Sequence, residues 1–154
     1  MVLYRVAKRR HADDLSGKGA EESGGRWNKA GFPALYLAEN ISLAILETIA
    51  HCQCINDLHN RLVLSIDVPD TSIITLDETD FPDNWNSIPW NNYTIENGTR
   101  WLSSQESLIL KIPSAIVPKE NIYIINPRHI DHKNVIIINK EIFKPDNRLV
   151  LFQD

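Results

Sequence analysis

The stretch Ser23-Gly24-Gly25-Arg26-Trp27-Asn28 is followed by Ala34-Leu35-Tyr36-Leu37-Ala38-Glu39 and then by the apolar segment 40–51. The paired glycines predict a turn whose backbone can approach a ligand closely. The next segment predicts a short strand that carries Tyr36, and segment 40–51 predicts a helix that carries Glu47. One short part of the chain therefore delivers a cation, two aromatic rings and a carboxylate, which we interpret as a binding and reaction site.

The composition is that of an ordinary globular protein. The chain of 154 residues is 43% hydrophobic and 23% charged, and this length predicts a single domain that spans residues 1–154. A net charge of −4 provides no electrostatic footprint for nucleic acid, so we expect no direct nucleic-acid binding.

The sequence also bears on location. No apolar run approaches the ~20 residues that a membrane-spanning helix needs, and segment 1–12 lacks the apolar core of a signal peptide. The two cysteines, Cys52 and Cys54, are spaced too closely for a mutual disulfide and do not match the spacing of zinc sites. These features predict a cytoplasmic protein with no membrane partner.

Hydrophobic periodicity predicts many strands and few helices. Strands are predicted at residues 2–6, 34–37, 62–68, 72–76, 107–112, 121–125, 135–138 and 148–152. Segment 41–52 predicts a helix that is apolar on nearly every side and therefore buried, and segment 93–104 predicts a helix weakened by Gly98. Segments 11–23 and 77–92 predict loops. Strands and helices that do not alternate regularly predict an α+β fold in a single compact domain.

Glu47 is the strongest sign of chemistry in the sequence. A carboxylate on a buried helix is costly unless it is paired or hydrogen-bonded. One interpretation is a structural pair with an arginine or with His51, which lies one turn later on the same face. The other is a functional carboxylate that binds a sugar hydroxyl or stabilises a developing cation.

Two arginines accompany this carboxylate. Arg26 follows two glycines, and a guanidinium suits phosphate because it can bind two oxygens at once; the alternative is a surface arginine stacked on Trp27. Arg5 lies in the middle of a predicted strand, where a long cation needs an anionic partner. Tyr36 and Trp27 can stack on a planar ring, or they can belong to the core.

Two serines flank the predicted strand at 107–112. Hydroxyls in the positions of Ser107 and Ser114 usually cap or turn the backbone. The sequence contains no Gly-x-Gly-x-x-Gly or Walker loop, no His-Glu-x-x-His, no Cys-x-x-Cys and no Gly-x-Ser-x-Gly. It therefore predicts neither a standard nucleotide cradle, nor a zinc site, nor a serine-hydrolase elbow.

The chain resembles the RES domain family, which is named for an arginine, a glutamate and a serine. The segments that carry the resemblance are Leu3-Tyr4-Arg5-Val6, Leu15-Ser16-Gly17-Lys18-Gly19-Ala20, Gly24-Gly25-Arg26-Trp27-Asn28, Ala34-Leu35-Tyr36-Leu37, Ala44-Ile45-Leu46-Glu47 with His51, Ser107-Leu108-Ile109-Leu110-Lys111-Ile112-Pro113-Ser114 and Asn126-Pro127. They follow the family's order and spacing and cover nearly the whole chain.

The resemblance implies a fold similar to the ADP-ribosyltransferase toxins, with mixed sheets and few helices. It implies the toxin of a bacterial type II toxin–antitoxin pair, which depletes NAD+ by cleaving the nicotinamide–ribose bond through hydrolysis or phosphorolysis. NAD+ is then the substrate, and no prosthetic group or metal is required. Some members instead ADP-ribosylate a protein. The implied partner is an Xre-type antitoxin, and the oligomeric state is left open.

The resemblance also assigns site residues. The residues implied to bind NAD are Arg5, Arg26, Trp27, Tyr36, Glu47, Ser107 and Ser114. Glu47, Arg26 and Ser107 form the implied catalytic set, with Glu47 at the reacting ribose and the arginines at the phosphates. Ser114 is the second choice for the family's serine. Many relatives have Ser/Thr-Gln at a position where this chain reads Tyr93-Thr94-Ile95, which makes Thr94 the candidate for that hydroxyl.

Overall fold

The computed structural model describes residues 1–149, apart from the side chain of Ile55. Its strands are β1 (Val2–Lys8), β2 (Leu35–Ala38), β3 (Arg61–Asp67), β4 (Ile73–Thr75), β5 (Ile109–Pro113), β6 (Asn121–Ile125) and β7 (Ile136–Ile142). Its α-helices are α1 (Lys18–Ser23), α2 (Ile41–Ala50) and α3 (Asn92–Ser104), and short 3-10 helices lie at Arg9–His11, Ile55–Leu58, Glu78–Asp80 and Ile130–Asn134. None of the helices within residues 1–149 has the length and apolar character needed to cross a membrane.

The strands form one mixed sheet in the order β4-β5-β6-β2-β1-β3-β7. β4 and β5 are parallel, and the other neighbouring pairs among residues 1–149 are antiparallel. β1 pairs with β3 along its whole length, but it meets β2 at a single register position, where Tyr4 lies opposite Ala38. The single-domain α+β architecture predicted from the sequence is confirmed.

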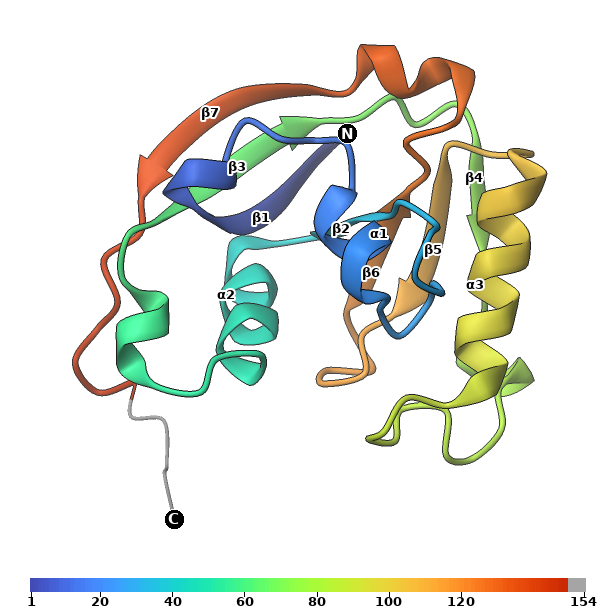
Figure 1. Ribbon diagram of the computed structural model, residues 1–154, viewed down its shortest axis with the longest axis horizontal. Coiled ribbons are helices and arrows are strands. Elements are labelled where there is room, and N and C mark those ends of the chain that lie inside the picture. The colour runs from blue at the N-terminus through green and yellow to red at the C-terminus, as the bar shows by residue number, and fades with distance from the viewer. Residues whose placement is uncertain (150–154) are drawn as a thin grey trace.

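Apolar side chains cover the sheet on both faces, as alternation along the strands requires. One cluster contains Leu3, Leu35 and Leu64 from neighbouring strands. The other joins strand residues to Leu43 of α2 and to Trp101 of α3. The two longer helices therefore pack on the same face of the sheet, with α2 beside β1 and α3 toward the β4 edge (Figure 1).

The environment of α2 differs from the sequence prediction. Leu43 and Ala44 are buried, but Ile41 and Leu46 are 41% and 38% exposed. The helix packs on the sheet through one face only, so the all-round burial predicted from its apolar composition is wrong.

Several other elements also differ from prediction. Residues 18–23, expected to lie in a loop, form α1, and β7 continues four residues beyond the predicted end of its strand at 138. The strand predicted at 148–152 is wrong at residues 148–149, which have no strand structure. Its last three residues lie outside the described range.

Helix α3 approaches the glycine turn closely at Gly98. A Cβ atom at this position would overlap the carbonyl oxygen of Trp27 and lie 2.7 Å from its carbonyl carbon. The hydroxyl of Thr99 accepts a hydrogen bond from the Lys29 backbone N–H at 3.0 Å. Gly98, expected from the sequence to weaken the helix, therefore allows α3 to support the turn.

Candidate active site

The Gly-Gly-Arg-Trp-Asn segment forms a tight turn. The backbone N–H of Gly25 donates to the Asn28 carbonyl at 2.9 Å, and the Asn28 N–H donates to the Gly25 carbonyl at 3.3 Å. Gly24 has a φ of 72°, a conformation that favours glycine. A Cβ atom on Gly25 would lie 2.7 Å from Asn28 Oδ1 and 2.9 Å from the Tyr36 hydroxyl oxygen. Both glycines are therefore needed for the turn to fit against β2.

The Tyr36 hydroxyl joins this turn to the sheet. It accepts a hydrogen bond from the Trp27 N–H at 3.1 Å and donates to Asn28 Oδ1 at 2.7 Å. Burial raises the pKa of Tyr36 well above its usual value, against smaller opposing effects of the Trp27 N–H and Arg26. The phenol is therefore neutral at physiological pH and keeps the proton that it donates.

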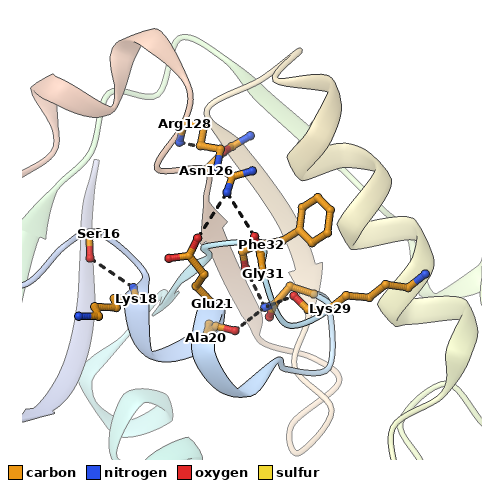
Figure 2. Close-up of polar contacts among 10 residues, drawn as sticks. Ser16, Lys18, Ala20, Glu21, Lys29, Gly31, Phe32, Asn126 and Arg128 are labelled. Carbon is orange, nitrogen blue, oxygen red and sulfur yellow. Dashed lines mark hydrogen bonds and ion pairs between the residues drawn. The ribbon is translucent and has the colours of Figure 1, made fainter.

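Buried Asn28 continues the network toward α1. Its Nδ2 donates to the carbonyls of Ala20 at 2.8 Å and Phe32 at 3.0 Å. Arg128, which follows β6, reaches the same region (Figure 2). Its Nη2 donates to Glu21 Oε1 at 3.4 Å and to the Gly31 carbonyl at 3.2 Å. The turn is thus supported by contacts from β2, α1, α3 and the segment after β6.

Glu47 projects from α2 toward the end of β5. Ser114, which is completely buried, donates its hydroxyl proton to Glu47 Oε1 at 2.7 Å. Ser114 Oγ also accepts hydrogen bonds from the backbone N–H groups of Ile116 and Val117, both at 3.1 Å. These two donors orient the hydroxyl toward the carboxylate. The expected pair with His51 is not formed through the carboxylate, because the His51 ring contacts the Glu47 backbone oxygen instead.

Arg26 anchors the loop between β4 and α3. Its Nη1 donates to the carbonyl oxygens of Trp85 at 3.1 Å and Ser87 at 3.0 Å. Burial lowers the pKa of the Arg26 guanidinium, and the Glu47 carboxylate is the largest of the effects that oppose this shift.

A cavity of about 800 Å³ lies between these groups. This volume falls within the range of about 300–1,000 Å³ that is typical of small-molecule sites. The cavity is bordered by β1 and β2 where those strands are joined by a single register position. Arg26, Tyr36 and Glu47 line it together with residues that flank Ser114. The structure therefore brings together the cation, the phenol, the carboxylate and one serine of the sequence prediction.

Arg5 borders the same cavity, but its charge is engaged elsewhere. Its Nη1 donates to the backbone oxygen of Asp14 at 2.9 Å. Burial lowers the pKa of Arg5, and the Asp14 carboxylate partly offsets this effect. The direct contact of this mid-strand arginine is therefore a backbone carbonyl in the segment between β1 and α1.

Other sequence-predicted residues lie apart from the Glu47 carboxylate. Trp27 is 1% exposed and packs against the rings of Phe81 and Trp85, so it belongs to the core while also bordering the cavity. Thr94 is buried in α3, where its hydroxyl donates to the Asn91 carbonyl, and it is not among the residues that line the cavity. The placement of Thr94 does not fit the hydroxyl expected at this site.

Ser107, the first choice for the family's serine, also lies away from Glu47. Its hydroxyl accepts a hydrogen bond from Trp101 Nε1 at 2.8 Å and donates to the Ile109 carbonyl at 3.0 Å. Of the two serines, Ser114 is the one that contacts the Glu47 carboxylate. The sequence could not separate the two serines, since each lies at one end of the same short strand.

Alanine substitution of each serine separates a site role from a core role. Ser114→Ala removes a hydrogen bond to a carboxylate, and we expect it to lower activity on the ligand of this site about 10- to 100-fold. Ser107→Ala leaves the buried indole N–H of Trp101 without its hydroxyl acceptor, and we expect it to cost about 1–3 kcal/mol of unfolding free energy while activity stays near wild type. Urea unfolding and steady-state assays of both variants test this assignment; equal activities would contradict it.

Arg61 and Trp90 are among the cavity-lining residues that were not predicted from the sequence. Arg61, at the start of β3, borders the cavity and donates Nε to the Asp57 carbonyl. Trp90 borders it from the loop between β4 and α3. No local pattern marks Arg61, whereas a tryptophan in a polar, proline-containing loop is a weak signal for Trp90. Among residues 1–149, no group of three or more His, Cys, Asp or Glu side chains is arranged to hold a metal ion.

Comparison with known proteins places this site in a family. A solved chain of the M. tuberculosis MbcT–MbcA toxin–antitoxin complex has the same fold, with a TM-score of 0.68 and 20% identity over 92% of this chain and 83% of that chain. "Toxin Res" of Yersinia enterocolitica is 45% identical over 84% of this chain and 86% of its own length, and "Toxin Res" of Photorhabdus laumondii is 40% identical over 97% of each. A protein of a Sphingobium species named "Prs ADP-ribosylating toxin" is 38% identical over 84% of this chain and 82% of its own. The family model for the RES domain matches residues 2–149, and the chain belongs to the RES domain family.

Proposed function

We propose that this protein is the toxin of a toxin–antitoxin pair and that it depletes NAD+ by cleaving the nicotinamide–ribose bond. The observation that carries the proposal is the Glu47 carboxylate, which Ser114 orients in the cavity that Arg26 and Tyr36 also line. The names of the relatives from Yersinia and Photorhabdus support a toxin. The proposal includes a cytoplasmic location, where this pool of NAD+ is found.

The chemistry requires stabilisation of positive charge on the ribose. As the C–N bond breaks, its electron pair leaves with nicotinamide, which becomes neutral, and the ribose acquires oxocarbenium character. A fixed carboxylate near the ribose stabilises this charge more strongly than a mobile solvent does. Water then adds to the ribose carbon and releases one proton to give ADP-ribose, or phosphate adds to give the ribosyl phosphate. The leaving group needs no strong general acid.

The other groups of the site have binding roles in this proposal. Arg26 and Arg5 both line the cavity and are the cations proposed to bind the pyrophosphate, although each also donates Nη1 to backbone carbonyl oxygen. The Tyr36 ring packs on nicotinamide while its hydroxyl remains in the turn network. Trp27 supports the turn from the core.

Product analysis tests the proposed reaction. Purified protein incubated with NAD+ is expected to release nicotinamide, with ADP-ribose as the second product if water is the acceptor. If phosphate is the acceptor, release depends on added phosphate and the second product carries an additional phosphate. Chromatography of reactions with and without phosphate distinguishes the two. Intact NAD+ in both reactions, with a folded and monodisperse protein, would overturn the proposal.

A second candidate is transfer of ADP-ribose to a protein. The specific observation in its favour is the Sphingobium relative whose name describes an ADP-ribosylating toxin. The same site would serve, with a protein side chain in place of water or phosphate as the nucleophile. NAD+ labelled in its adenylate half distinguishes the candidates: transfer places the label on one cellular protein, whereas degradation leaves it in a small molecule.

A toxin of this kind needs a neutralising partner. The structural neighbour is part of a toxin–antitoxin complex by its title, and we propose that this chain likewise pairs with an antitoxin, of the Xre type. Expression of the chain alone would then arrest growth, and co-expression of the antitoxin would restore it.

A further inference from the structure

Trp90 differs from the other tryptophans in its surroundings. Trp27, Trp85 and Trp101 are 1%, 3% and 7% exposed, whereas Trp90 is 39% exposed and borders the cavity. The described ring contacts join Trp27, Phe81, Trp85 and Tyr93 and do not include Trp90. Its indole is therefore not part of the aromatic core.

The loop that carries Trp90 is held in place on both sides of the tryptophan. Arg26 binds the backbone oxygens of Trp85 and Ser87, and the Ser87 hydroxyl donates to the Pro89 carbonyl at 3.1 Å. On the other side, Asn91 Nδ2 donates to Asn84 Oδ1 at 2.8 Å. Figure 1 shows this loop in yellow-green between β4 and the start of α3. Trp90 thus presents its indole from a loop fixed by the site arginine.

Trp90 is one of the exposed residues of the cavity lining. Ser114, hydrogen-bonded to Glu47, is fully buried, so the reacting end lies inward. Trp90 borders the same cavity together with two other exposed apolar residues, Ile88 at 87% and Ile116 at 39%. An extended dinucleotide whose ribose–nicotinamide bond lies at Glu47 needs a contact for its second base elsewhere in the cavity lining, and these exposed apolar residues offer one.

We propose that Trp90 is the stacking platform for the adenine base of the dinucleotide. The inference rests on the proposed function, because it assumes NAD+ as the ligand. A purine ring stacks favourably on an indole face. Such stacking contributes binding energy without hydrogen bonds to the edge of the base. Trp90 is accordingly a binding residue that acts on the adenylate half and not on the bond that is cleaved.

Substitution of Trp90 is expected to change KM for NAD+ and to leave kcat nearly unchanged. Trp90→Ala should raise KM for NAD+ about tenfold or more, with kcat nearly unchanged, and Trp90→Phe should recover most of the loss because it retains a ring. Ile130→Ala is the matched control, since Ile130 is 77% exposed and does not line the cavity. Circular dichroism of all variants checks that they are folded.

The two halves of the ligand identify the base that stacks. AMP should inhibit wild type and quench its tryptophan fluorescence, and both effects should weaken about tenfold in Trp90→Ala. Turnover or inhibition by nicotinamide mononucleotide should be the same in wild type and variant. Equal KM values for NAD+ in wild type and Trp90→Ala, or weakened binding of the mononucleotide alone, would overturn the inference.

The experiment distinguishes failure of this inference from failure of the proposed function. If wild type cleaves NAD+ and Trp90→Ala has the same KM, the adenine platform is wrong and the activity stands. If wild type releases no nicotinamide but AMP quenches Trp90 fluorescence, the activity is wrong and the adenine platform stands.

Discussion

Replacement of Glu47 by glutamine is expected to lower the rate of nicotinamide release from NAD+ by a factor of about 100 to 1,000. Glutamine retains the size of the side chain. Its amide oxygen can accept the hydrogen bond that the Ser114 hydroxyl donates to Glu47 Oε1 at 2.7 Å. The substitution therefore removes the negative charge while preserving the shape of the cavity. Because the charge acts on the oxocarbenium-like transition state, the loss should appear in kcat.

A surface carboxylate provides the matched control for this variant. Glu106 is exposed and does not line the cavity, so Glu106→Gln changes the net charge equally and should leave nicotinamide release at the wild-type rate. Release is followed by chromatography under saturating NAD+, and folding is checked by thermal unfolding. Equal rates for wild type and Glu47→Gln would show that Glu47 is not the reacting carboxylate.

Gly98→Ala is expected to destabilise the fold by about 3 kcal/mol or more. The added methyl group would overlap the Trp27 carbonyl oxygen and lie 2.9 Å from its Cβ atom. Neither group can move easily, because the first belongs to the backbone of the glycine turn and Trp27 is 1% exposed. A loss of this size lowers Tm by roughly 10 °C in a domain of this length.

A second helical glycine distinguishes steric overlap from helix propensity. Gly19 in α1 has no atom within 4 Å of the position that a Cβ would occupy. Gly19→Ala should therefore leave Tm unchanged or raise it slightly, because alanine favours helix by about 0.5–1 kcal/mol over glycine. Thermal unfolding followed by circular dichroism measures both variants. A Tm for Gly98→Ala equal to that of Gly19→Ala would contradict the close packing of α3 on the turn.

Short-range patterns in the sequence identified most of the sheet and the centre of the site. Alternation and β-branched runs predicted strands at β1, β2, β3, β4, β5 and β6, because the period of two along a strand is a local property. The paired glycines predicted the turn, since close backbone approach at Gly25 excludes a side chain. Glu47 stood out because a carboxylate in an apolar helix demands a partner.

Local patterns did not identify the partners of those residues. Ser114 lies 67 positions from Glu47 in the chain, and its role follows from the antiparallel pairing of β5 with β6 and the packing of α2 on the sheet. Ser107 has the same residue type at the other end of one strand, yet it belongs to the core with Trp101. The positions of Ser107 and Ser114 in the sequence therefore do not indicate which of them contacts Glu47.

The stretch from Ser23 to His51 supplies the turn, the strand and the helix of the site, and each of these follows from glycine conformation, strand alternation or apolar content within a few residues. The role of each side chain in this stretch depends on contacts with residues that are distant in the sequence. Arg26 binds carbonyl oxygens in the loop near Trp85, which makes the arginine both a cavity group and a loop anchor. Gly98 sets how closely α3 can approach the turn. Hydrogen bonds and steric fit at a few ångströms decide these roles, and they arise only when the sheet has brought the separate segments together.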